Sequence, residues 1–265
     1  MKVYISADIE GVTGIAHWDE AEKNKSDYLQ FQAQMQRELN AACEGALAAG
    51  VDEIWVKDAH DSGRNLIPQK LPQQVRLIRG WSGHPYSMVQ ELDESFDALI
   101  FIGYHSRAGA NTNPLSHTMS TAVTRVIVNG EAVSEFTLHA YVAEMLGVPV
   151  VFLSGDEGIC ADAKKMIPEI RTVAVNRGVG SSSISIHPDI AVADIRENVR
   201  LALTASPQAC RFQLPEKYIA EIEYKDHPAA YRFSFYPGAS LSADCRVRFE
   251  TNNWFEAMRF IHFVT

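Results

Sequence analysis

Two carboxylates stand at the end of the first apolar run of the chain, where their spacing suits a metal ion. Residues 3–5 form a β-prone segment, and Asp8 and Glu10 follow it two positions apart. On an extended segment, residues i and i+2 point to the same side. Open α/β sheets bind their ligands at the carboxyl ends of the strands, so both acids can face one ligand there. Taken alone, the pair fits a solvated strand end before a glycine turn better.

Residue types that bind metals also stand where later apolar segments end. Asp58 and His60 mark the end of one such segment, and His105 follows another at 98–103. Glu135 opens a helix that is predicted directly after a hairpin. Because the carboxyl ends of parallel strands meet at one edge of a sheet, we expect these side chains to converge on one site.

The types of donor indicate which metal would bind. Carboxylates and imidazoles without thiolates suit zinc or manganese and not calcium. Asp8 can use both carboxylate oxygens to bridge two ions about 3.5–4 Å apart, as in two-metal hydrolases. One carboxylate and one histidine then remain for each ion, from the set Glu10, His60, His105 and Glu135. Such sites keep positions open for water and substrate, which is typical of a catalytic centre.

Each of these residues also has an ordinary explanation. His60 fits a solvated histidine of a polar loop, and His105 fits a histidine bonded to a backbone carbonyl at the edge of the core. The helix dipole alone accounts for Glu135. Asp58 fits either a strand end or a group that orients His60. Their joint occurrence at successive strand ends favours the metal site.

His117 lies in the segment 115–119, after the loop that leaves His105. A loop histidine near a metal pair can act as a nucleophile, a general acid–base or an oxyanion stabiliser. A surface histidine without a role explains it equally well. The G-x-S-x-G and H-E-x-x-H motifs are absent, so neither a serine-hydrolase elbow nor a zincin site is supported.

Alternating strands and helices must position these residues. Helical spacing over 28–49 separates the first strand from a second at 53–58, which predicts a βαβ unit with parallel strands. Asn129 and Gly130 predict a hairpin between 124–128 and 131–133. The other predicted elements are strands at 75–80, 98–103, 149–153 and 170–175, helices at 85–92, 135–146, 157–167, 188–204, 229–235 and 253–264, and a serine-rich loop at 180–183.

This order of elements predicts an α/β fold with a mostly parallel sheet flanked by helices. From about residue 212 the apolar residues alternate instead, as at Ile219 and Ile222. We therefore predict a metal-binding catalytic domain over residues 1–210 and a small α+β lobe over 211–265, packed on it.

Composition narrows the possible partners and the compartment. The chain has 265 residues, of which 46% are hydrophobic, and a formal net charge of −9, which argues against a nucleic-acid partner. No apolar run reaches the roughly 20 residues of a membrane helix, and no signal peptide is recognised. The four cysteines are far apart and form no C-x-x-C pair. We expect a cytoplasmic protein with no membrane partner.

Six segments together resemble the DppA-type D-aminopeptidases, the zinc peptidases associated with bacterial dipeptide-transport operons. They are A-D-I-E-G at 7–11, K-D-A-H-D at 57–61, I-G-Y-H-S-R at 102–107, L-S-H-T-M at 115–119, G-E-A-V-S-E at 130–135 and S-G-D at 154–156.

The resemblance implies a dinuclear zinc centre that hydrolyses short peptides with an N-terminal D-residue, such as D-Ala-D-Ala. It makes Asp8 the bridging ligand. It gives one zinc to Glu10 and His105 and the other to His60 and Glu135. His117 matches the histidine proposed as nucleophile, although a metal-bound hydroxide with His117 as proton carrier or transition-state stabiliser is chemically simpler. The resemblance also implies a homo-oligomer, a decamer of stacked rings.

The leading hypothesis is therefore a zinc-dependent D-aminopeptidase with two ions per subunit, and manganese or another divalent metal would suit the same donors. An amidase for another small amide would use the same centre. A non-catalytic metal- or peptide-binding module of a transport system would need neither open metal positions nor His117.

Overall fold

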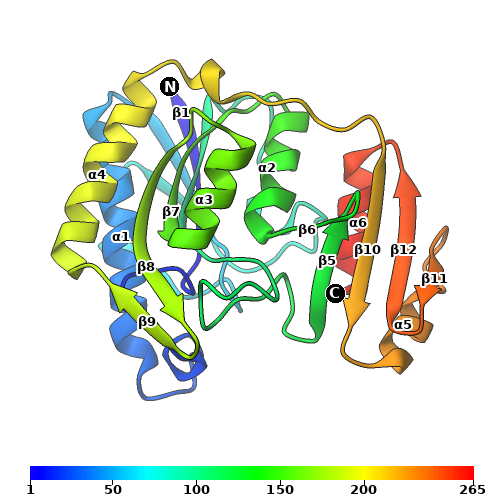
Figure 1. The fold of residues 1–265 in the computed structure, drawn as a ribbon. Coiled ribbons are helices and arrows are strands. Elements are labelled where there is room, and N and C mark those ends of the chain that lie inside the picture. Colours follow the sequence, from blue (N-terminus) through cyan, green and yellow to red (C-terminus); the bar gives the residue numbers. More distant parts are fainter.

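The computed structural model describes all 265 residues and contains two β-sheets (Figure 1). The larger sheet has seven strands in the spatial order β3-β2-β1-β4-β7-β8-β9, all parallel except β9. The strands are β1 Lys2–Ala7, β2 Glu53–Asp58, β3 Val75–Ile78, β4 Ala98–Tyr104, β7 Val150–Asp156, β8 Arg171–Val179 and β9 Ser182–Ser185. The strand order reverses between β1 and β4, which is where open α/β sheets form a ligand crevice.

Helices cover both faces of this sheet (Figure 1). Two pack against each other on one face, and two cover the other. They are α1 Tyr28–Ala48 with α4 Pro188–Thr204, and α2 Glu135–Met145 with α3 Glu157–Met166. Every residue of β4 and of β7 is buried as a result. These strands are apolar throughout most of their length because neither face meets water. The predicted α/β fold is confirmed.

The second sheet has five strands in the order β11-β12-β10-β5-β6. The strands are β5 Val123–Val128, β6 Glu131–Ala132, β10 Tyr218–Tyr224, β11 Ser240–Ala243 and β12 Arg246–Thr251, and two helices accompany them, α5 His227–Phe233 and α6 Trp254–Val264. The predicted hairpin at 124–133 thus belongs to this sheet, because β5 pairs with β10 along Val126–Ile222. The division at residue 210 stays a prediction, but the lobe built on this sheet also takes in residues 123–132.

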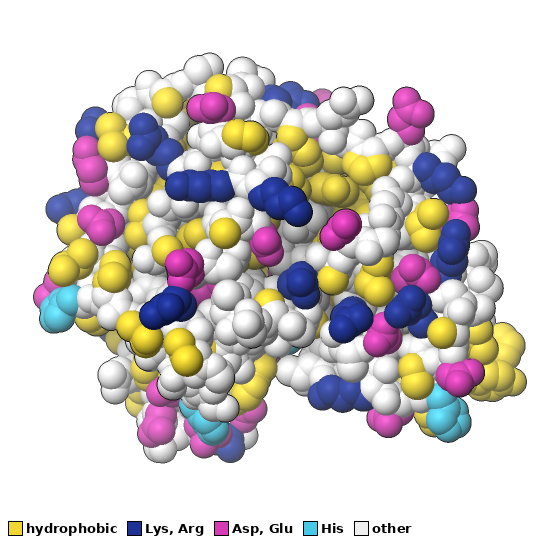
Figure 2. Space-filling model, in the orientation of Figure 1, with side chains coloured by type: hydrophobic (Ala, Val, Ile, Leu, Met, Phe, Trp, Pro, Cys, Tyr) yellow, Lys and Arg dark blue, Asp and Glu magenta, His cyan; other side chains and the backbone are white.

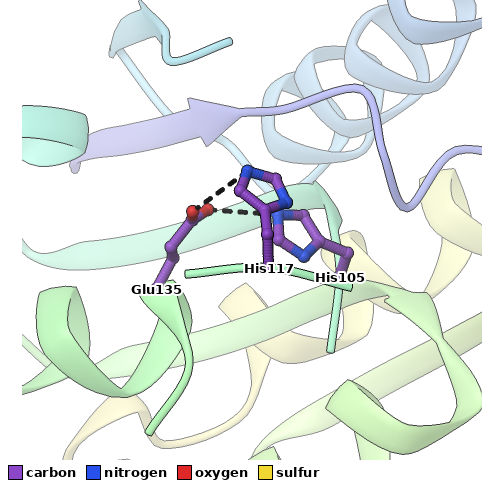
Figure 3. A group of neighbouring side chains, drawn as sticks. All are labelled: His105, His117 and Glu135. Atoms are coloured by element: carbon purple, nitrogen blue, oxygen red, sulfur yellow. Dashed lines mark ion pairs between the residues drawn. The ribbon is translucent and has the colours of Figure 1, made fainter. Parts of the chain in front are cut away.

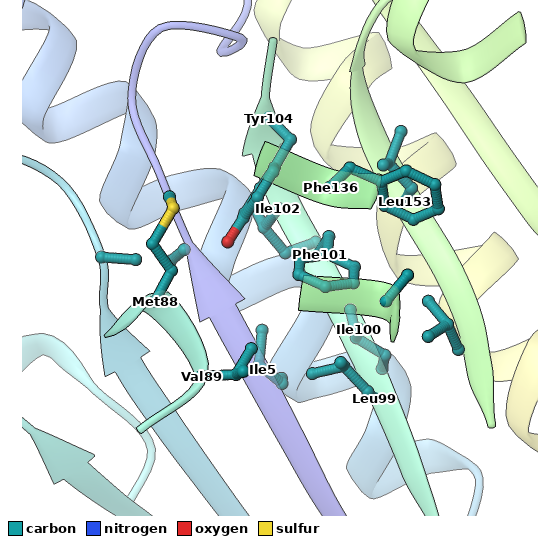
Figure 4. Close-up of a cluster of buried hydrophobic side chains, with 14 of the residues drawn as sticks. Ile5, Met88, Val89, Leu99, Ile100, Phe101, Ile102, Tyr104, Phe136 and Leu153 are labelled. Atoms are coloured by element: carbon teal, nitrogen blue, oxygen red, sulfur yellow. The ribbon is translucent and has the colours of Figure 1, made fainter. Parts of the chain in front are cut away.

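One continuous core joins the two sheets. The buried apolar side chains form a single cluster that includes residues of β1, β4, β10 and α6. Figure 4 shows part of it, where Phe101 of β4 packs against Phe136 of α2 with ring centroids 5.3 Å apart. Trp254 of α6 is buried, and its Nε1 donates to the carbonyl of Leu138 at 3.2 Å. The lobe is therefore packed against the helices of the larger sheet.

Most predicted elements form, and the departures have local causes. The predicted helix at 85–92 is only a short 3₁₀ helix at Ser87–Val89, where Ser87 has a positive φ of 44° that an α-helix excludes. The serine-rich segment predicted as a loop at 180–183 becomes the turn and start of β9, an exposed edge strand. The segment lacks the apolar residues by which buried strands are recognised, because β9 is an exposed edge strand that buries neither face.

None of the helices combines the length with the apolar character that a membrane crossing requires. On the face seen in Figure 2, Lys and Arg side chains are interspersed with Asp and Glu. That face carries no uniformly basic patch of the kind that nucleic-acid binding requires.

Candidate metal centre

The predicted site residues converge at the crevice between β1 and β4. Asp8 and Glu10 follow β1, His60 follows β2, and His105 follows β4. Glu135 is the first residue of α2, whose N-terminus Ser134 caps by accepting from the amide of Thr137. All five residues are nearly buried, with exposed fractions of 6% or less.

Asp8 lies between the two histidines. Its Oδ1 is 3.4 Å from Nδ1 of His60, and its Oδ2 is 3.6 Å from Nε2 of His105. Glu10 Oε2 is 3.0 Å from Nδ1 of His60, and Glu135 Oε2 is 3.2 Å from Nε2 of His105. The donor atoms of Asp8, Glu10 and His105 all lie within 4.8 Å of one another. Carboxylate oxygens and imidazole nitrogens thus alternate around a shared centre.

His117 lies beside this group (Figure 3). Its Nε2 is 3.6 Å from Oε1 of Glu135, and its ring stacks on the ring of His105. The same Glu135 oxygen accepts the amide of Met119 at 2.6 Å, which fixes the carboxylate. His117 keeps 15% of its side chain exposed, so that a molecule in the crevice can reach it.

In each of the three histidines, the ring nitrogen that faces away from the carboxylates is bonded to a backbone carbonyl. His60 Nε2 donates to the carbonyl of Ala21 at 2.8 Å, and His105 Nδ1 donates to the carbonyl of Ser106 at 2.9 Å. His117 Nδ1 donates to Leu115 at 3.0 Å. Metal-binding histidines are oriented in this way, with the second N–H held by a backbone carbonyl or a carboxylate.

Two buried polar atoms of this group have no hydrogen-bond partner. They are Oε2 of Glu10 and Nε2 of His105. Buried polar atoms almost always have partners. A cation would satisfy both atoms at once, and oxygen and imidazole donors at this spacing suit a zinc-type ion. The residues present therefore fit a metal.

The charges of the group shift one another's pKa values strongly. Burial and the neighbouring Glu10 carboxylate raise the pKa of Asp8 well above its usual range. Burial alone would lower the pKa of His105, but Glu135 and Asp8 outweigh it and raise that pKa to about 10. Burial opposes ionisation of Glu135, yet His105 and His117 lower its pKa to about 2. The buried carboxylates thus draw protons onto the histidines, and a metal cation can take the place of those protons.

Asp58 has a different task from the other acids. Its Oδ2 accepts the amides of Asn65 and Leu66 at 2.5 and 2.7 Å, and the side chain of Asn65 donates to the carbonyl of His60 at 2.6 Å. Asp58 therefore shapes the loop that carries His60. Of the two interpretations of Asp58 from the sequence, this favours a group that orients His60.

Other residues that position the site are not evident from the sequence. Asn113 Nδ2 donates to the carbonyl of Glu10 at 2.9 Å and to Oδ2 of Asp156 at 3.1 Å, and its Oδ1 accepts the amide of Leu115. Asp156 also accepts the amide and hydroxyl of Ser106. These bonds tie the loop between His105 and His117 to the end of β1. Asp156 lies in the S-G-D segment, and Asn113 lies in the segment 109–114, whose side chains are expected to shape the pocket, but the sequence does not single out either residue for this role.

The strand ends touch through their main chains. A Cβ at Gly11 would lie 1.8 Å from the carbonyl oxygen of Tyr104, and one at Gly155 would lie 2.0 Å from the same oxygen. Both contacts require glycine. They bring the loop after β1 and the end of β7 directly against the end of β4.

A cavity of about 1180 Å³ opens above the group. Asp8, Glu10, His60, His117 and Glu135 are among the residues that line it. A volume of this order accommodates a small molecule or a short peptide.

An α/β fold with a carboxylate–histidine group at the carboxyl ends of its strands is the class of protein that carries a metal centre there. The sequence gives the family. The sequence pattern of the D-aminopeptidase family matches residues 1–263. The chain belongs to the D-aminopeptidase family and is a peptidase.

Two relatives show how far the likeness extends. The D-aminopeptidase of Bacillus subtilis (strain 168) is 30% identical over 259 residues, which are 97% of this chain and 94% of that protein. A solved structure, described as the Zn-dependent D-aminopeptidase DppA from Bacillus subtilis, a self-compartmentalizing protease, superposes with a TM-score of 0.94 at 29% identity. It covers 100% of this chain and 96% of its own.

Proposed function

We propose that this protein is an aminopeptidase that hydrolyses short peptides with an N-terminal D-residue, such as D-Ala-D-Ala, at a centre of two zinc ions. The observation that carries the proposal is the position of Asp8, whose two oxygens face His60 on one side and His105 on the other. The zinc dependence named for the Bacillus subtilis relative supports the choice of metal.

Asp8 would bridge the two ions, with Glu10, His60, His105 and Glu135 as the other ligands. The common spacing of Asp8, Glu10 and His105 is compatible with giving Glu10 and His105 to one ion, and His105 shares the same spacing with Glu135 and His117. His60 and Glu135 would hold the other ion, although each lies closer to the opposite partner, Glu10 and His105 respectively. The ligand set is thus supported more directly than its division between the ions.

Bound zinc would polarise the scissile carbonyl and lower the pKa of a bound water. The protein's own part is proton transfer and orientation. Because the N–H at Nδ1 of His117 is engaged by Leu115, its Nε2 is free to accept a proton from the attacking water and to pass it to the leaving amine. We therefore assign His117 as the proton carrier. The free α-amine of the substrate would meet a metal or a carboxylate, which explains removal of the first residue.

Release of free D-alanine from D-Ala-D-Ala, with zinc and after chelation, tests this function. We expect zinc-dependent release that is lost on chelation and is slower with L-Ala-L-Ala. Chelation-sensitive hydrolysis of a different amide only would favour the amidase instead. Metal binding without any turnover would favour the binding module.

We also propose a homo-oligomer, with the decamer implied by the resemblance as its size. The self-compartmentalization named for the Bacillus subtilis relative supports assembly. Tyr231 and Phe235 support it as well, because they contact each other edge to face and are 61% and 70% exposed. Neighbouring exposed aromatic side chains are typical of interaction surfaces. Sedimentation equilibrium would give the number of subunits.

A further inference from the structure

Two solvent-exposed cationic side chains line the same cavity as the proposed metal ligands. Lys23 and Arg64 are the only Lys or Arg residues that line it. Lys23 follows the short 3₁₀ helix at Trp18–Glu20, and Arg64 lies in the loop after His60. The ammonium of Lys23 donates to the carbonyl of Arg64 at 3.0 Å, which joins the two segments.

Neither charge is neutralised within the protein. No carboxylate lies within 4.0 Å of Lys23 or Arg64, and the guanidinium of Arg64 makes no hydrogen bond, in contrast to the paired Arg37, Arg211 and Arg246. Two acids, Glu22 and Asp61, line the same cavity but form no ion pair with these cations. A guanidinium offers two parallel N–H groups that match a carboxylate.

The segments that carry the two cations are held in place. The amide of Asn65, next to Arg64, donates to Asp58 at 2.5 Å. The carbonyl of Ala21, two residues before Lys23, accepts from His60 at 2.8 Å. The backbone segments that carry both cations are therefore held near His60, a proposed metal ligand, and both residues line the cavity.

The terminal carboxylate of a dipeptide substrate needs a cationic partner. Only one residue separates its scissile carbonyl from its terminal carboxylate, and adjacent Cα atoms are about 3.8 Å apart. With the carbonyl at the metal ligands, the carboxylate would still lie in the cavity, where Arg64 and Lys23 offer cationic partners. Longer peptides or terminal amides would bring no charge to this place.

We propose that Arg64, assisted by Lys23, binds the terminal carboxylate of the substrate, so that the protein prefers dipeptides to longer or amidated peptides. This rests on the proposed aminopeptidase function. Arg64 would make the paired contact, and Lys23 would add charge from the neighbouring segment.

The test measures binding and turnover separately. The binding probe is the D-Ala-D-Ala analogue in which CH₂–NH replaces the peptide bond, compared with its terminal carboxamide, by calorimetry on the zinc-loaded protein. The turnover substrates are D-Ala-D-Ala and D-Ala-D-alaninamide. The variants are Arg64→Ala and Lys23→Ala, with Arg76→Ala as the matched control, because Arg76 is exposed and pairs with Glu53 away from the cavity.

We expect the wild-type protein to bind the acid about tenfold more tightly than the carboxamide. Arg64→Ala should lose that preference and raise KM for D-Ala-D-Ala about tenfold, with little change for the amide. Lys23→Ala should lose part of the preference, and Arg76→Ala none.

Equal affinity of the wild-type protein for the acid and the carboxamide would overturn the proposal. An equal loss of affinity for both probes in Arg64→Ala would overturn it as well. So would a wild-type protein that binds neither probe. A wild-type protein that prefers the acid but releases no D-alanine from D-Ala-D-Ala would contradict the aminopeptidase function. The carboxylate site would still be supported.

Discussion

The imidazole rings of His105 and His117 lie stacked, with centroids 4.3 Å apart and ring planes 11° apart (Figure 3). The two residues are the ends of one loop that folds back on itself. Thr118 helps to close that loop, because its hydroxyl accepts the amide of Ala108 at 3.0 Å and donates to Val133 at 3.1 Å. A proposed metal ligand and the proposed proton carrier therefore form one wall of the site.

Alanine substitutions should separate these two roles. His60→Ala removes a nitrogen that lies 3.0 Å from Glu10 and 3.4 Å from Asp8, so we expect it to lower the zinc content. His117→Ala should keep the zinc and reduce kcat by about 10²–10⁴-fold, as the loss of a general acid–base does. Elemental analysis and steady-state kinetics check both. His227→Ala, which replaces an exposed histidine of α5, is the control. Equal zinc loss in both site variants would make His117 a ligand.

Removal of the Asn113 side chain should loosen the site without removing a ligand. Asn113→Ala leaves the buried carbonyl of Glu10 and the amide of Leu115 without their partner. We expect the free energy of unfolding to fall by about 1–3 kcal/mol, and kcat to fall more than the zinc content does.

Urea unfolding, elemental analysis and kinetics measure the three quantities. Asn198→Ala is matched to it, because Asn198 is half-buried on α4 and its side chain makes one solvent-exposed bond, to the carbonyl of Asp194. If Asn113→Ala changed stability but left kcat unaltered, the positioning role would be wrong.

Zinc binding should release protons at neutral pH. Burial would lower the pKa of His60, but the Glu10 and Asp8 carboxylates raise it well above 6.5, and the pKa of His105 is raised to about 10. In the zinc-free protein both rings are therefore positively charged at pH 7, with a proton on each nitrogen. Each ring must lose one of these protons to bind a metal. The affinity for zinc should rise as the pH rises from 6 to 8. Calorimetry in two buffers of different ionisation enthalpy counts the protons, and a count of zero would contradict the prediction.

Lys57 should make stability depend on pH in the alkaline range. Its buried ammonium donates to the carbonyls of Asp58 and Gly80 and lies 3.7 Å from the ring centre of Trp81. Burial lowers its pKa from 10.5 to about 8. Between these values the unfolded chain holds the proton and the folded protein does not, so the free energy of unfolding rises with pH.

Relative to Lys57→Met, this rise should approach about 3 kcal/mol between pH 8 and 10.5, from the size of the pKa shift. Urea unfolding at several pH values measures it. Lys70→Met, at an exposed position, should show no such dependence. A relative fall in stability over this range would contradict the argument.

The sequence predicts the parts of the fold that follow from local pattern. Buried parallel strands are continuous apolar runs, so β4 and β7 are recognisable without partners. The sequence does not show that β5 pairs with β10, since Val126 and Ile222 are nearly a hundred residues apart and either strand alone would suit several sheets.

The same distinction applies to the site. Asp8, Glu10, His60 and His105 stand directly after strands, so their convergence follows from parallel pairing alone. Asn113 acts through bonds to backbone groups of distant loops, and these depend on the folded path of the loop. Arg64 is a cation in a polar loop, and only the cavity around it suggests a ligand.

The close approach of Gly11 and Gly155 to the carbonyl of Tyr104 has an evolutionary consequence. Main-chain contacts fix how far apart the proposed metal ligands stand, whatever side chains surround them. Relatives can therefore exchange residues around the mouth of the cavity and acquire new substrates while the metal ligands keep their places. Substrate range and catalytic chemistry are in this way separately adjustable within one scaffold.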